Sequence, residues 1–253
     1  MRLTIVGCSG SYPGPDSAAS CYLVEAPYAG RTWRLVLDLG NGAFGPLQAA
    51  TDVFDVDAVL ISHLHADHCV DLTAYFVARK FHPSGPRRPL SVYGPADIAQ
   101  RVDRAYGSPG ELLKARQFEF QVWGEVAPLR IGPFGIQVAR VHHPVETYAI
   151  SVEHDGRRLV YSGDTGPCDS LVSLAAYADL LLCEASFREG RENPSDLHMT
   201  GGQAGDHATR AGARMLVLTH VPPWYDPAGA LAEAQLTYDG PLELAKPGAT
   251  YDI

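Results

Sequence analysis

The sequence predicts an α/β protein in which two β-sheets pack face to face and helices cover their outer faces. Short β-rich runs alternate with segments of helical periodicity along the whole chain. The 253 residues are 46% hydrophobic and 19% charged, a balance that allows a sizeable core. Polar side chains gather at the ends of predicted strands, where a rigid sheet presents them to a crevice. These observations also fit one domain spanning residues 1–253.

The first half of the chain opens with a short apolar strand that stops at a loop rich in Gly, Ser and Pro. A four-residue apolar run then marks a buried strand before the polar segment Ser62–His68, and Pro95 takes a favourable first helical position. The expected strands are Leu3–Val6, Cys21–Glu25, Arg34–Asp38, Ala58–Ile61 and Leu90–Tyr93. The expected helices cover Ala43–Ala50, Leu72–Arg79 and Pro95–Ala105.

The second half repeats the alternation of strands and helices. Its expected strands are Phe118–Val122, Ile136–Val141, Tyr148–Val152, Leu159–Tyr161, Asp179–Cys183, Met215–Thr219 and Leu242–Leu244. Its expected helices are Asp169–Tyr177, Gly202–Ala211 and Pro227–Leu236. Ser62–His68, His143, Asp164, Glu184 and His220 each lie at or just beyond a predicted strand end.

Composition limits the classes of partner. The net charge of −9 disfavours a large nucleic-acid partner, which normally meets a basic face. The one compact basic stretch, Arg79-Lys80 with Arg87-Arg88, could contact phosphates or form a solvated loop. The opening MRLTIVGCSG is too short for a signal peptide, and no apolar run reaches the roughly 20 residues of a membrane helix. Five scattered cysteines indicate neither disulfides nor a thiolate zinc site, so we expect a cytoplasmic protein.

The segment His63-Leu64-His65-Ala66-Asp67-His68 concentrates three imidazoles and a carboxylate directly after a buried strand. These groups are ligands for zinc, manganese or iron. Four of them together with distant ligands exceed one tetrahedral ion. We therefore expect His63 and His65 on one metal, and Asp67 and His68 on its neighbour.

The HxHxDH run resembles the signature of the metallo-β-lactamase superfamily, an αββα four-layer sandwich of two mixed sheets flanked by helices. His143 in HHPVETYAI, Asp164 in YSGDTG and His220 in LTHVPPW follow in that family's order. The resemblance implies two divalent ions, with zinc favoured over manganese and iron. One ion is held by His63, His65, His143 and Asp164, and the other by Asp67, His68, Asp164 and His220. His142 remains an alternative to His143, because neighbouring residues on a strand face opposite ways.

Two metal ions would lower the pKa of a bridging water towards about 7, giving a hydroxide that attacks phosphorus or a carbonyl carbon. Asp67 could accept its proton. His198 in DLHMTGG and Glu184 in LLCEAS resemble residues of the ribonuclease Z branch. There the histidine protonates the leaving group and the glutamate orients the histidine. We expect a Glu184–His198 hydrogen bond with the same purpose.

Within that branch, the stretches GCSGSYPGPDSAASCYL, LISHLHADHCVDL and YSGDTGPCDSL are similar to compact bacterial cyclic nucleotide phosphodiesterases of an atypical class II type. The resemblance implies a small phosphodiester substrate such as cyclic AMP, and a homodimer. Transfer-RNA processing and hydrolysis of a lactone or thioester are the alternatives. Candidates for stacking on the base are Trp224, Tyr225, Phe81 and Tyr75, and Cys69 is expected to be a buried filler.

Overall fold

Two β-sheets form the centre of the molecule. In the computed structural model, which describes residues 1–85, 87–124 and 129–253, they have eight and seven strands. The first sheet has the order β15-β1-β3-β4-β5-β6-β7, and β2 pairs with β1 outside this path. Its strands are β1 (Arg2–Ser9), β2 (Ala18–Ala19), β3 (Cys21–Tyr28), β4 (Arg31–Leu37), β5 (Ala58–Leu60), β6 (Leu90–Gly94), β7 (Phe118–Val122) and β15 (Thr250–Asp252).

The second sheet has the order β14-β13-β12-β11-β10-β9-β8. Its first members in the chain, β8 to β11, are antiparallel, and β11 to β14 are parallel, so the sheet is mixed. Its strands are β8 (Leu129–Ile131), β9 (Phe134–Arg140), β10 (Tyr148–His154), β11 (Arg157–Tyr161), β12 (Leu180–Glu184), β13 (Leu216–Thr219) and β14 (Leu242–Leu244).

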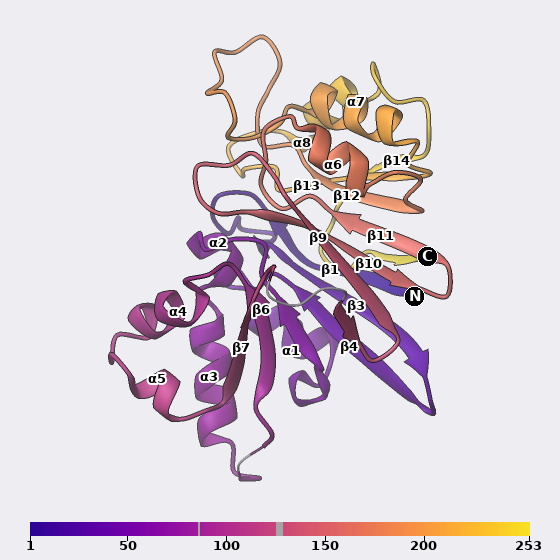
Figure 1. Cartoon of the computed structure of the whole chain (residues 1–253). Coiled ribbons are helices and arrows are strands. Elements are labelled where there is room, and N and C mark those ends of the chain that lie inside the picture. The colour runs from indigo at the N-terminus through magenta and orange to yellow at the C-terminus, as the bar shows by residue number, and fades with distance from the viewer. Residues whose placement is uncertain (86, 125–128) are drawn as a thin grey trace.

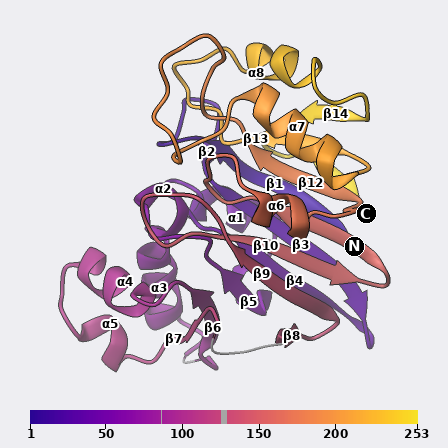
Figure 2. The same cartoon turned by 45° about the horizontal axis from the view of Figure 1, so that its top comes forward.

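The helices lie on the outer faces of the two sheets (Figure 1). One layer covers the first sheet with α1 (Phe44–Ala50), α3 (Leu72–Phe81), α4 (Ile98–Tyr106) and α5 (Glu111–Lys114). The other covers the second sheet with α6 (Asp169–Leu174), α7 (Gly201–Ala211) and α8 (Pro227–Ala234). A view turned by 45° shows the same order of layers (Figure 2). The four-layer sandwich expected from the sequence is therefore confirmed.

Alternation along the strands divides the apolar residues among three cores. In β3, Tyr22 and Val24 point between the sheets, whereas Leu23 faces the helices of the first layer. In β12, Leu180 and Leu182 point between the sheets and Leu181 faces α6, α7 and α8. Strands buried on both faces explain the continuous apolar runs in the sequence.

Several boundaries differ from the sequence expectation. The helix expected from Pro95 begins at Ile98, whose N–H donates to the Pro95 carbonyl, so Pro95 starts a turn that precedes the helix. The strand expected to end at Asp38 ends at Leu37, and Asp38 takes a left-handed φ of 55°. Part of the polar segment after β5 forms one helical turn, α2 (Ala66–Cys69). No helix among the described residues is long and apolar enough to cross a membrane.

Candidate metal centre

The carboxyl ends of strands from both sheets meet at one edge of the sandwich, and the candidate ligands lie there. His63, His65, Asp67 and His68 follow β5 of the first sheet. The second sheet contributes three further residues: His143 between β9 and β10, Asp164 after β11, and His220 after β13. The structure brings all seven together in two groups that share Asp164.

The first group contains His63, His65, His143 and Asp164. Its ligand atoms lie within 4.8 Å of one another. His65 Nδ1 lies 3.0 Å from His63 Nε2 and 3.3 Å from His143 Nε2, and His63 Nε2 lies 3.6 Å from Asp164 Oδ2. Four ligands about 2.1 Å from a tetrahedral ion would lie about 3.4 Å apart, close to these separations.

The second group contains Asp67, His68, Asp164 and His220, all buried. His220 Nε2 lies 3.1 Å from both His68 Nε2 and Asp67 Oδ2. Asp164 Oδ1 lies 3.3 Å from His68 Nε2 and 3.4 Å from His220 Nε2. This oxygen is buried, yet it accepts no hydrogen bond within the described part of the chain.

The outer ring nitrogens of three of these histidines are already used by neighbours, so the other ring nitrogen of each faces the two ligand groups. His68 Nδ1 donates to Asp38 Oδ2 at 2.6 Å, and His143 Nδ1 donates to the Leu197 carbonyl at 2.8 Å. Ser186 Oγ donates to the His220 carbonyl and accepts from His220 Nδ1, both at 2.8 Å. An imidazole that donates through one ring nitrogen and carries no second proton offers the lone pair of its other nitrogen, which here lies beside the carboxylates and the other rings. A divalent cation fits this arrangement, because it would receive those lone pairs and the unpaired oxygen of Asp164.

Asp38 is a supporting residue that the sequence analysis did not single out. Its carboxylate is fully buried and accepts four hydrogen bonds: from the backbone and hydroxyl of Ser62, from His68 Nδ1 and from the Tyr161 hydroxyl, at 2.6–2.8 Å. Asp38 therefore fixes the orientation of His68 and the start of the histidine-rich segment. The available signal was its position directly after the apolar run Leu35–Leu37, the same strand-end placement as the other site residues.

Backbone packing holds the ligand segments tightly. A Cβ on Gly40 would come within 1.9 Å of the Asp67 carbonyl oxygen, and one on Gly10 within 2.2 Å of the His220 carbonyl oxygen. Only glycine allows these approaches. His220 itself has a φ of 57°, a left-handed conformation that is uncommon for a residue with a side chain. Cys69 is buried as expected, with its thiol donating to the His65 carbonyl at 3.3 Å.

Glu184 and His198 lie beside the two ligand groups. Glu184 is fully buried and accepts from His198 Nδ1 at 2.8 Å, from Thr165 N at 2.8 Å and from Ser186 N at 3.1 Å. The hydrogen bond expected between Glu184 and His198 is therefore present. The ring centroid of His198 lies 5.4 Å from that of His143 and 5.7 Å from that of His220.

The electrostatics favour a charged His198 and ionised ligand carboxylates. Burial lowers the pKa of His198, but the Glu184 carboxylate outweighs it and raises this pKa to about 9. Burial also raises the pKa of Asp164, but nearby His220, His68 and His63 hold it well below its usual range. His63 has a strongly lowered pKa, mainly because it is buried. Histidine without a proton and ionised aspartate are the forms that bind metal.

The loop that carries His198, between β12 and α7, stands out at the top of Figures 1 and 2. Glu233 of α8 fastens both of its ends. Glu233 Oε1 accepts from Glu189 N at 3.1 Å and pairs with Arg188 Nε at 3.0 Å, while Oε2 accepts from Gly201 N at 3.1 Å. The position of His198 therefore depends on α8 as well as on Glu184.

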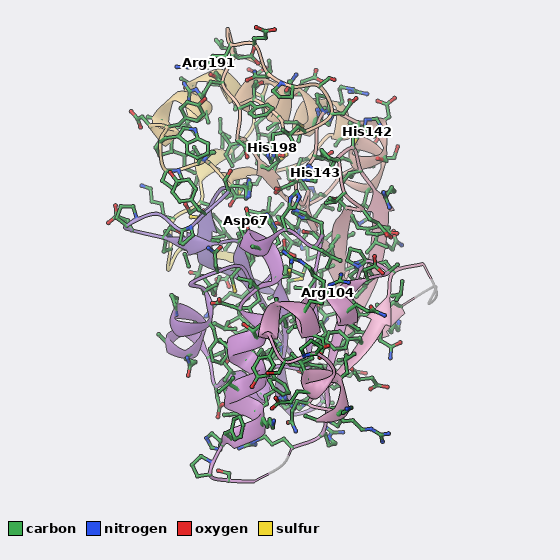
Figure 3. The ribbon with its side chains drawn as sticks, turned by 90° about the vertical axis from the view of Figure 1, so that its left-hand side faces the viewer. Asp67, Arg104, His142, His143, Arg191 and His198 are labelled. Atoms are coloured by element: carbon green, nitrogen blue, oxygen red, sulfur yellow. The ribbon has the colours of Figure 1, made fainter. Side chains whose placement is uncertain are left out.

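Figure 3 separates the two adjacent histidines. His143 is labelled near Asp67 and His198, whereas His142 lies farther out, with its Nδ1 3.8 Å from Asp196 Oδ1 and 59% of its side chain exposed. The alternative that His142 takes the place of His143 is therefore wrong in geometry.

Two of the aromatic candidates for base stacking are also excluded. Tyr75 is fully buried and donates its hydroxyl to the Val53 carbonyl, and Phe81 is the last residue of α3, which leads away from the site. Trp224 is 57% exposed and lies four residues after His220.

The basic stretch noted in the sequence is partly used inside the fold. Arg79 is 3% exposed and donates to the carbonyls of Gln117 and Arg88. Lys80 pairs with Glu111. At least these two charges are engaged within the protein, which reduces the basic surface on offer to a phosphate backbone.

Comparisons with known proteins agree with this fold. The sequence profile of the beta-lactamase superfamily domain matches residues 34–221. A Mycobacterium leprae (strain TN) protein is 44% identical over 258 residues, covering 100% of this chain and 89% of the relative. The probable metallo-hydrolase YhfI of Bacillus subtilis (strain 168) is 30% identical over 256 residues and covers 100% of both chains. Its crystal structure matches with a TM-score of 0.86 at 29% identity over 99% of each chain. Ribonuclease Z of Myxococcus xanthus (strain DK1622) is 28% identical over 306 residues, covering 100% of this chain and 98% of the enzyme.

Proposed function

We propose that this chain is a phosphodiesterase that hydrolyses cyclic AMP to AMP with two divalent ions. The chain belongs to the β-lactamase superfamily and is a metal-dependent hydrolase. His63, His65, His143 and Asp164 would hold one ion, and Asp67, His68, Asp164 and His220 the other. Zinc is the first choice for both, with manganese and iron as alternatives, because imidazole and carboxylate ligands accept all three.

The observation that carries the proposal is the buried Glu184–His198 pair beside the ligand groups. The carboxylate keeps His198 protonated at neutral pH, and the side chain is 13% exposed, so its free nitrogen can reach a substrate. Cleavage of a phosphodiester releases an alkoxide, which is a poor leaving group and needs a proton. A positioned general acid of this kind typically contributes about 10²–10⁴-fold to the rate.

The other residues have complementary tasks. When bound, the divalent ions activate water as a nucleophile at neutral pH and neutralise negative charge on the phosphate. Asp67 retains 10% exposure of its side chain and is placed to accept the proton that the water loses. His65, His143 and His198 are the partly exposed members of the cluster, so the substrate approaches from their side.

A transfer-RNA 3′-processing activity is the second candidate, supported by the ribonuclease Z relative. The connection between His143 and Asp164 disfavours it here. This segment is filled by the antiparallel hairpin of β10 and β11, which leaves no room in it for an arm that grips a large RNA. The net charge of −9 also disfavours a polyanionic substrate.

Hydrolysis of a lactone or thioester is the third candidate, because the same metal chemistry attacks carbonyl carbon. An acyl substrate with a good leaving group gains little from a proton donor. The loss of rate on removing His198 therefore separates a phosphodiester from a thioester, which releases a thiolate. A lactone also releases an alkoxide, so it is separated by a direct comparison of lactone hydrolysis with AMP release.

The test is an assay of AMP release from cyclic AMP. Metal-free protein is reloaded separately with zinc and with manganese, and Asp164→Asn serves as the blank. We expect turnover that depends on metal and is absent from the variant. Protein that holds two ions but releases no AMP with either metal would contradict the assignment of cyclic AMP as substrate. Precursor transfer RNA and a lactone panel are then the next substrates.

A further inference from the structure

An exposed aromatic strip lies next to His220. The rings of Tyr12 and Trp224 are 5.3 Å apart between centroids with a 38° tilt, and these side chains are 42% and 57% exposed. Trp224 continues to Tyr225 at 6.1 Å, and the guanidinium of Arg191 lies 5.6 Å from the Tyr225 ring. Figure 3 places Arg191 at the top of the site face, on the loop that also carries His198. Contiguous exposed apolar surface is the kind of feature that marks ligand-binding grooves when the patch is large.

The two segments that carry the strip, the loop with Tyr12 and the turn with Trp224, both adjoin His220. On one side, Cys8 accepts from His220 N at 3.0 Å, Gly10 N donates to Val221 O at 3.2 Å, and Ser11 N approaches His220 Nε2 at 3.4 Å. Ser11 therefore borders the ligand atoms, and Tyr12 is the next residue.

On the other side, two prolines and one valine separate His220 from Trp224. Pro223 also supports the Tyr12 loop, because a Cβ on Gly14 would meet its ring at 3.2 Å. The loop is closed by Ser9 Oγ donating to the Tyr12 carbonyl at 2.8 Å. Tyr12 therefore directly follows a residue that borders His220, and Trp224 lies four residues after His220 in the chain.

We propose that Tyr12 and Trp224 form a stacking platform for the nucleobase of a nucleotide whose phosphate lies at the metal centre. This inference rests on the proposed phosphodiesterase function and adds to it the residues that bind the base. Aromatic faces stack on any base, with a contribution of about 1–3 kcal/mol per base. Neither ring donates to or accepts from the metal ligands, so the platform acts on substrate affinity while the chemistry stays with the metal centre.

The experiment measures binding of AMP and of ribose 5-phosphate, which lacks the base, to the metal-loaded protein by calorimetry. Tyr12→Ala and Trp224→Ala are each expected to weaken AMP binding by about 5- to 150-fold, the equivalent of about 1–3 kcal/mol, and to leave ribose 5-phosphate binding unchanged. Tyr28→Ala is the matched control, since Tyr28 is 54% exposed but lies at the opposite end of β3 from the site. AMP should also quench tryptophan fluorescence in the native protein more than in Trp224→Ala, which retains the other two tryptophans, and ribose 5-phosphate should quench neither.

The outcomes separate the platform from the phosphodiesterase function. Equal affinity of the native protein for the two phosphates, or unchanged AMP affinity in both variants, would overturn the platform even if cyclic AMP is hydrolysed. A base-dependent loss of AMP affinity in the variants supports the platform even if cyclic AMP is not turned over. In that case only the assignment of cyclic AMP as the substrate is contradicted.

Discussion

Replacing Asp38 by asparagine tests whether this buried carboxylate orients His68. Three donors converge on Asp38 Oδ2, and Ser62 N–H donates to Oδ1. An asparagine amide must present its NH₂ group either to the three donors or to the Ser62 N–H. In both orientations a buried donor loses its acceptor, at a cost of about 1–3 kcal/mol, and a charge-assisted bond worth about 1.5–3 kcal/mol is lost. We expect Asp38→Asn to lower the free energy of unfolding by about 2.5–6 kcal/mol, the sum of the two contributions.

The same substitution should weaken metal binding, because the second group loses the fixed ring orientation of His68. Loss of such a supporting partner typically costs about 10–100-fold in metal affinity. Unfolding by urea of the metal-free protein gives the stability, and competition with a chromophoric chelator gives the affinity. Asp252→Asn is the control, since Asp252 is 80% exposed in its pair with Arg2 and should change stability by less than about 0.5 kcal/mol. An Asp38→Asn protein with native stability and native metal affinity would refute the reasoning.

Three further predictions concern the rest of the site. His198→Asn should lower kcat for cyclic AMP by about 10²–10⁴-fold at unchanged metal content. Because the folded-state pKa of His198 is raised to about 9, the acid is present below that pH and lost above it. Bound cations lower this pKa, so we expect the native rate to begin to fall at a pH below about 9. A rate that still rises at alkaline pH would contradict the role of His198 as the acid. Asp164→Asn removes an oxygen anion shared by both ligand groups, so elemental analysis after dialysis should show loss of metal, and full retention would contradict the shared role. Glu233→Ala removes the acceptor at both ends of the His198 loop, so it should lower kcat more than it changes KM. Glu233→Gln should restore part of the rate. Equal kcat in the native protein and both variants would show that the loop does not depend on Glu233 for its position.

Much of the fold was predictable because its signals are local. The buried strand β5 is a short apolar run directly before polar residues, and α7 begins at Gly201, one residue before its predicted start at Gly202. Pairing across the chain left no such signal. The terminal strand β15 was not predicted, and it pairs antiparallel with β1 at the other end of the sequence. The short strands β2 and β8 were missed for the same reason, since their stability comes from their neighbours.

The candidate metal ligands could be predicted from the sequence because motif and strand end coincide at His63–His68, Asp164 and His220. What the sequence lacked was side-chain direction and burial. The sequence does not show that the side chain of His143 points into the cluster and that of His142 away from it. Nor does it show that Tyr75 is buried and Trp224 exposed. Asp38 was counted as the last residue of a strand, because nothing in the local pattern predicts the left-handed φ that turns its carboxylate towards His68.

The division of the ligands between the two sheets has a consequence for the order in which the centre is assembled during synthesis. The group of His63, His65, His143 and Asp164 is complete in sequence once the chain has been translated as far as β11 and the turn after it. The group with His220 needs β12, α7 and β13 to leave the ribosome first. Since a domain generally folds as a unit, and β1 pairs with β15 at the far end of the chain, translation as far as β11 does not by itself assemble the first group. Both groups form together, once the sheets that position their residues are complete.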